Sequence, residues 1–174
     1  TASTASTVAS ATMWASAFPE PTESLVSKMF SSVIVVDATN RYVKLLNCAD
    51  RYASSVDIPS YIKQKVENGS TVWYASDDNY EGEEGQTDVY RVTKLGFSTF
   101  GQAKNLTEIT IPSTITEIGD DCFAGCTALN SVIFEVTTGW KAGNTTLSSS
   151  DLANPTTAAT FLTSTYKNDI WTRS

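Results

Sequence analysis

Short apolar or alternating segments, separated by polar residues, fill the first half of the chain. Such segments are typical of β-strands. We predict strands over residues 33–36, 42–46, 56–59, 71–74 and 88–92. The last two flank an acidic segment and are expected to pair as a hairpin with a long loop. Residues 24–30 differ, because their apolar side chains have helical spacing, and they predict a short helix.

The second half of the chain contains an internal repeat. When the sequence is shifted by 23 residues, seven pairs of apolar residues or glycines are superposed. These pairs are Val92 and Ile115, Leu95 and Ile118, Gly96 and Gly119, Phe100 and Phe123, Leu106 and Leu129, Ile109 and Val132, and Ile111 and Phe134. The positions between them are mostly polar and vary freely. This pattern predicts stacked turns that bury the same positions against one another. A partial third copy, residues 56–62, matches residues 109–115 at an offset of 53.

The two full copies resemble the leucine-rich repeats of the Treponema pallidum or Bacteroides surface antigen (BspA-like) type. A unit of that family has the blocks Val-Thr-x-Ile-Gly, Ala-Phe-x-x-Cys and Leu-x-x-Ile-x-Ile-Pro. The matching residues here are Ile115, Ile118 and Gly119, then Phe123 and Cys126, then Leu106, Ile109, Ile111 and Pro112. Cys122 and Ala103 depart from the pattern, and the second copy lacks the final Ile-Pro. The resemblance covers residues 50–174.

The resemblance implies an α+β, mostly β fold. Its centre is a short right-handed leucine-rich-repeat solenoid of 23-residue repeats, between an N-terminal α/β cap and a C-terminal helical cap. The expected units are a leader or assembly arm at 1–22, the N-terminal cap at 23–90, two repeats at 91–135 and the C-terminal cap at 136–174. Because side chains alternate along a strand, the candidate binding face consists of the outward residues Asp57, Glu108, Thr110, Ser131 and Ile133.

The C-terminal segment carries a helix-start signal of its own. Asn154 is suited to cap a helix N-terminus, and Pro155 fits the first helical position. We expect this helix, together with Trp140 and Trp171, to cover the exposed end of the stack, since the last turn of a repeat array has no neighbour.

Composition excludes several functions. Lys and Arg number 12 against 19 Asp and Glu, so the net charge of −7 has the wrong sign for nucleic-acid binding. Histidine is absent, which removes Ser–His and Cys–His nucleophile pairs and histidine metal sites. No apolar segment is long enough to span a membrane. Cys48, Cys122 and Cys126 are too few for a four-cysteine zinc site and are expected to be buried thiols. We therefore predict that the chain is not an enzyme.

An acidic segment, residues 77–88, holds six carboxylates in twelve residues. Asp77, Asn79, Glu81 and Asp88 occupy positions 1, 3, 5 and 12 of a loop that resembles an EF-hand calcium loop. Position 12 is aspartate instead of the usual glutamate, and the flanking segments are predicted strands, not helices. A solvated hairpin loop is the alternative. No cofactor is expected, with calcium as the exception to be tested.

The first 18 residues contain fourteen Ser, Thr or Ala and no charge. One interpretation is a flexible leader, because this composition buries too little apolar surface to fold by itself. The other is an assembly arm that lies across a neighbouring subunit, with Trp14 and Phe18 as its anchors.

Two functions follow from these observations. The resemblance implies a non-enzymatic, extracellular or surface-displayed domain that mediates adhesion or protein–protein binding. The alternative is a structural subunit of an ordered assembly, such as a filament, surface layer or virion decoration, that uses the N-terminal arm for subunit contacts. Both imply a protein partner or self-association, without nucleic acid and without a membrane span.

Overall fold

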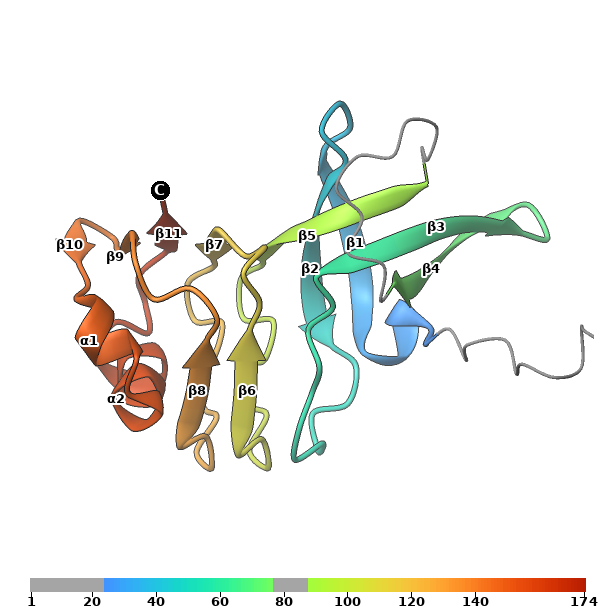
Figure 1. Ribbon diagram of the computed structural model, residues 1–174. Helices are drawn as coiled ribbons and strands as arrows, with labels where there is room; N and C mark the ends of the chain where they lie inside the picture. Colours follow the sequence, from blue (N-terminus) through green and yellow to red (C-terminus); the bar gives the residue numbers. More distant parts are fainter. Residues whose placement is uncertain (1–23, 77–87) are drawn as a thin grey trace, which may run out of the picture.

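The computed structural model describes residues 24–76 and 88–174 (Figure 1). Eleven strands lie within these ranges: β1 (Phe30–Asp37), β2 (Tyr42–Cys48), β3 (Tyr61–Glu67), β4 (Ser70–Ser76), β5 (Val89–Leu95), β6 (Glu108–Ile111), β7 (Glu117–Ile118), β8 (Ser131–Phe134), β9 (Trp140–Ala142), β10 (Thr145–Thr146) and β11 (Trp171–Arg173). The helical elements are the 3-10 turn η1 (Val26–Lys28), the α-helices α1 (Ser149–Leu152) and α2 (Pro155–Thr160), and the π-helical η2 (Phe161–Thr165). The fold is mostly β, as predicted.

Strand β5 joins the N-terminal strands to the repeats. The main sheet has the order β1-β2-β5-β7-β11-β9-β10, and β3 with β4 branches from β5. One edge of β5 pairs with β2 in parallel, and its other edge pairs first with β3 in antiparallel and then with β7 in parallel. Figure 1 shows β5 crossing between the two halves of the molecule. The sheet is therefore continuous across the chain.

The strands of the two repeats pair in the register that the sequence predicts. In the second sheet, β6 pairs with β8 in parallel, with Glu108 opposite Ser131 and Ile111 opposite Phe134. Strands β5 and β7 keep the same offset, since Leu95 lies opposite Ile118. The predicted repeat period is thus confirmed.

The apolar positions that the period superposes form one hydrophobic core. The rings of Phe100 and Phe123 stack with centroids 5.0 Å apart and planes 8° from parallel. Leu106, Ile109 and Val132 are also buried. Matched side chains therefore pack on one another from repeat to repeat, which is what the sequence pattern predicts.

The partial third copy is confirmed at its offset of 53 but not as a strand. Thr107 donates from its backbone N–H and from its hydroxyl to the carbonyl of Ser54, at 3.0 and 3.2 Å. Ser55 forms an isolated parallel bridge with Glu108. The prediction of a strand at 56–59 is wrong, because Pro59 has no N–H to donate and the chain leaves this sheet to begin β3 at Tyr61.

Of two further predictions about the N-terminal region, one is confirmed in part and one is wrong. The short helix predicted within residues 24–30 is the 3-10 helix η1, which is only three residues long because Phe30 already belongs to β1, which the branched residues 33–36 extend. Strand β4 does not pair with β5. It pairs with β3 through a two-residue turn, Asn68-Gly69, in which both residues have positive φ, 51° and 78°.

The predicted helix start in the C-terminal segment is confirmed. The side-chain oxygen of Asn154 accepts hydrogen bonds from the N–H groups of Thr156 and Thr157, both at 3.1 Å, and Pro155 is the first residue of α2. Helix α2 packs against β8. Trp140 and Trp171 are almost fully buried, with ring centroids 6.4 Å apart. These residues lie beside the second repeat.

Candidate functional site

Four of the five predicted binding-face residues lie together on the exposed side of β6 and β8. The register places Glu108 beside Ser131 and Thr110 beside Ile133. The hydroxyl of Ser131 donates to Oε2 of Glu108 at 3.0 Å. Ile133 is 40% exposed although its neighbours in β8, Val132 and Phe134, are buried. This side of the small sheet thus presents polar side chains around one branched apolar residue.

The fifth residue, Asp57, is exposed and lines a cavity of about 580 Å³. The cavity lies where the polypeptide before β3 meets the β3–β4 pair and the residues that follow β6 and β8. Its lining residues are Ser24, Met29, Asp57, Ile58, Pro59, Ser60, Tyr61, Ala75, Ser76, Ser113 and Glu135. Ser113 and Glu135 place this cavity at the C-terminal ends of β6 and β8, so we name the cavity and the outward residues of these two strands together the acidic face.

The charge of the acidic face has one sign. Asp57 and Glu135 line the cavity, and no Lys or Arg of residues 24–76 and 88–174 lines it. Oε2 of Glu135 accepts a hydrogen bond of 2.7 Å from the N–H of Ser113, which fixes the carboxylate at the rim. Glu108 adds a third carboxylate on β6. Such an arrangement attracts cationic groups and repels anionic ones.

Glu135 is not among the site residues predicted from the sequence. Glu135 is the counterpart of Pro112 one repeat later, at the position where the second copy departs from the Ile-Pro ending. That departure was the available signal, because it replaces a proline by a charged side chain at the end of a strand. Tyr61 and Met29 carried no such signal, since only the fold brings them to this cavity.

The arm and calcium predictions fall largely outside the described residues. The residues of these predictions that lie outside the described ranges are Trp14, Phe18, Asp77, Asn79 and Glu81. Asp88 is described, and its carboxylate lies 3.6 Å from Nζ of Lys63. Within residues 24–76 and 88–174, no three His, Cys, Asp or Glu side chains gather to hold a metal ion.

The three cysteines are free, buried thiols, as predicted. Burial raises the pKa of Cys122 to about 12 and that of Cys126 to about 11. Burial also raises the pKa of Cys48. The thiol of Cys126 donates to the carbonyl of Phe100 at 3.1 Å. These groups stay protonated near neutral pH, so they behave as small core side chains and not as nucleophiles.

Stacked turns with a constant repeat register, matched apolar side chains buried between the turns and strands with alternating burial are typical of leucine-rich repeats. Residues 90–167 match the family described as BspA type leucine-rich repeat region (6 copies). This part of the chain is therefore a BspA-type leucine-rich-repeat region, which confirms the resemblance that the repeat motifs indicated.

Among solved structures, a leucine-rich cell surface protein of Faecalibacterium prausnitzii A2-165 is similar to this chain, with 25% sequence identity and a TM-score of 0.40. The match covers 62% of this chain and 22% of that one, so this chain spans about a fifth of its length. No curated protein matches the chain. None of the helices in the described ranges has the length and apolar character that a membrane crossing requires.

Proposed function

We propose that this chain is a non-enzymatic, protein-binding module of a surface-displayed protein. In this proposal, residues 91–135 are turns of a right-handed solenoid, the strands before them close its first turn, and α2 with Trp140 and Trp171 covers its last. Support comes from the match of residues 90–167 to the BspA-type repeat family. Leucine-rich repeats present an extended face suited to protein partners.

The acidic face is the proposed binding surface, and its partner is a protein with a basic patch. The observation that carries this choice is that Asp57 and Glu135 line one cavity whose described lining residues include no Lys or Arg, and Glu108 adds a carboxylate at the start of β6. Charges of one sign at an interface steer a partner of the opposite sign and exclude partners of the same sign. Ile133, which is 40% exposed, adds apolar surface that a partner side chain can cover.

Titration with a short peptide tests this proposal. The probe is acetyl-Gly-Lys-Gly-Arg-Gly-amide, and an otherwise identical peptide with two glutamates is the negative probe. We expect saturable binding of the basic peptide in an NMR titration at low salt, weakening as salt rises. Asp57→Asn and Glu135→Gln should each weaken it several-fold.

Asp151→Asn is the matched control, because Asp151 is exposed on α1 and does not line the cavity. Equal weakening by all three substitutions would mean that net charge alone attracts the peptide. Equal binding of the acidic peptide would also contradict the proposal.

A second candidate function, a subunit of an ordered assembly, is favoured by one observation. Strand β1 ends the main sheet and pairs only with β2 among the described strands. Its residues Ile34, Val35 and Val36 are 45%, 42% and 39% exposed. No residue from 30 to 36 is charged. An uncharged apolar edge is suited to pair with the same strand of a second copy about a two-fold axis.

A further inference from the structure

A second cavity, of about 360 Å³, shares Ser113 with the cavity of the acidic face. The ends of β1 and β2, the middle of β5, the segment before β7 and the strand β11 surround it. Its lining residues are Val36, Asp37, Tyr42, Arg91, Thr93, Lys94, Ser113, Thr114, Thr116 and Arg173. Its volume is within the range of small-molecule sites. We name it the basic cavity, because three of these residues are Arg or Lys.

Arg173 provides a cationic group without a carboxylate partner. Its guanidinium donates from Nε to the carbonyl of Ile115 at 3.2 Å and from Nη2 to the carbonyl of Ser113. It also lies over the ring of Trp140, 5.8 Å from the centroid. No carboxylate of the described residues is within ion-pair distance of it. These contacts hold the guanidinium in place and leave its charge uncompensated.

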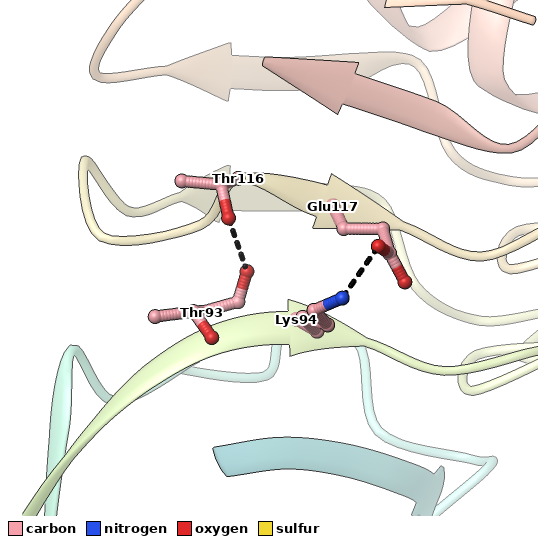
Figure 2. A network of polar contacts seen from close by, with 4 residues as sticks. All are labelled: Thr93, Lys94, Thr116 and Glu117. Carbon is pink, nitrogen blue, oxygen red and sulfur yellow. Dashed lines mark hydrogen bonds and ion pairs between the residues drawn. The ribbon is translucent and has the colours of Figure 1, made fainter. Parts of the chain in front are cut away.

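The other charged residues of the cavity have contacts of their own. Nζ of Lys94 lies 2.7 Å from Oε2 of Glu117, and Figure 2 shows this pair spanning β5 and β7. Asp37 accepts hydrogen bonds from the backbone and the side chain of Asn40, at 2.9 and 2.8 Å, so its carboxylate already has donors. The guanidinium of Arg91 lies over the ring of Tyr61, 5.7 Å from the centroid.

Two hydroxyl groups in the basic cavity are buried without a hydrogen-bond partner. They are Oγ1 of Thr93 and Oγ1 of Thr114. Thr93 is only 6% exposed, and it is the residue that the pairing of β5 with β2 skips between Val92 and Lys94. Its carbonyl accepts the hydroxyl of Thr116 at 3.3 Å, whereas its own hydroxyl points away from Thr116 in Figure 2. A buried hydroxyl without a partner costs folding free energy, so a χ1 rotation that turns it toward an acceptor in the cavity would recover that cost.

We propose that the basic cavity binds the carboxylate group of an acidic ligand. The guanidinium of Arg173 supplies the charge and further N–H donors, and Thr93 and Thr114 turn their hydroxyls toward the carboxylate oxygens when the ligand binds. Asp37 and Glu117 would repel a phosphate dianion more strongly than a singly charged carboxylate. This site shares only Ser113 with the cavity of the acidic face and differs from it in charge, so it stands whether or not the basic-peptide proposal holds.

A carboxylate of this kind occurs both on acidic sugars and at peptide C-termini. Two probes distinguish these sources: D-glucuronate represents the sugar and N-acetylglycine the peptide. D-glucose and inorganic phosphate are the corresponding neutral and dianionic controls. We expect calorimetry or NMR to detect saturable binding of at least one carboxylate, and little or none of glucose and phosphate. The tighter of the two carboxylates then identifies the source.

Substitutions locate the site. Arg173→Gln removes the charge and is expected to weaken binding at least ten-fold. Thr93→Val replaces the hydroxyl by a methyl group of similar size and is expected to weaken it several-fold. Lys104→Gln is the matched control, because Lys104 is exposed and does not line the cavity, and it should leave affinity unchanged.

A measurement on the unsubstituted protein keeps the proposal testable even if a substitution impairs folding. Amide chemical shifts of Thr93, Thr114 and Thr116 in the unsubstituted protein should move along the same saturation curve as the calorimetric signal. Absence of saturable binding of both carboxylates would overturn the proposal. So would equal loss in Lys104→Gln, or shift changes confined to residues outside the basic cavity.

Discussion

At Gly119, two consecutive repeats approach each other backbone to backbone. A Cβ atom built on Gly119 would lie 2.7 Å from the carbonyl carbon of Gly96 and equally close to the nitrogen of Phe97. These neighbours are backbone atoms and cannot rotate away as a side chain could. The glycine that recurs at 96 and 119 therefore sets how closely the turns stack.

We predict that Gly119→Ala destabilises the protein by about 1–3 kcal/mol, the usual cost of forcing an extra carbon into a packed region. Urea denaturation monitored by circular dichroism measures this. Thr127→Ala, at an exposed position of the same repeat, should change the free energy of unfolding by less than about 0.5 kcal/mol. An unchanged midpoint for Gly119→Ala would contradict the close approach of the two backbones.

The buried thiols predict a loss of stability at alkaline pH. An unfolded cysteine has a pKa of 9.0, whereas Cys122 and Cys126 ionise at about 12 and about 11 in the folded protein. Between these values the folded state binds more protons than the unfolded state, so the free energy of unfolding falls as pH rises. Denaturation from pH 8 to pH 11.5 should show this decline. Cys122→Ala should make it shallower, and an equally steep decline in that variant would contradict the assignment.

Single residues differ in how far the sequence could predict them. The buried positions that recur from repeat to repeat, such as Phe100 and Phe123, were predictable because their side chains are apolar. The backbone conformation of single residues was not predictable. Ser98 and Asp121 share a positive φ, 50° and 52°, one repeat apart although their side chains differ. A comparison of residue types cannot detect a repeated φ angle when neither residue is glycine.

On the scale of one strand, β8 allows a matched comparison of its two sides. Leu129, just before β8, is buried, whereas Ile133 within it points outward. We predict that Leu129→Ala costs about 2–5 kcal/mol, the range for truncating a buried leucine. Ile133→Ala should cost less than about 1 kcal/mol, since its side chain fills no cavity. Chemical denaturation of both variants measures the difference, and equal costs would put the repeat register in doubt.

Elements were predictable where a local signal sufficed. Asn154-Pro155 defines the start of α2 by chemistry within three residues, and residues 33–36 form a strand through their branched side chains. The pairing of β2 with β5 was not predictable, because two parallel strands far apart in sequence are not joined by a tight turn whose residues could indicate the pairing. The β3–β4 hairpin had a clear local signal, because Asn68-Gly69 is a typical two-residue hairpin turn. We nevertheless predicted that residues 71–74 pair with residues 88–92.

On the scale of the whole molecule, the assembly alternative predicts a mass that depends on β1. Ile34→Lys places a charge on the uncharged edge and should shift an oligomer toward monomer with little change in melting temperature. Size-exclusion chromatography with light scattering measures the mass. Val66→Lys is the control, because Val66 is also exposed but lies on β3.

Deleting residues 1–22 distinguishes association through the N-terminal arm from association through β1. If Trp14 and Phe18 anchor an arm, the deletion weakens the oligomer while leaving the melting temperature nearly unchanged. If β1 pairs with itself, the deletion leaves the oligomer intact. A monomer at all concentrations for the full chain would remove the assembly alternative and leave the binding module.

The parallel pairing of β2 with β5 also matters while the chain is being made. Tyr42 lies opposite Arg91, which is synthesised only after β3, β4 and the acidic segment. At about 5–20 residues per second, a ribosome needs roughly 2–10 s to supply that partner, whereas the β1–β2 hairpin forms within microseconds. During this interval the outer edge of β2 lacks its final neighbour β5, and the apolar residues of the hairpin are open to other chains. The early seconds of synthesis are therefore when this protein depends most on chaperones or on low local concentration.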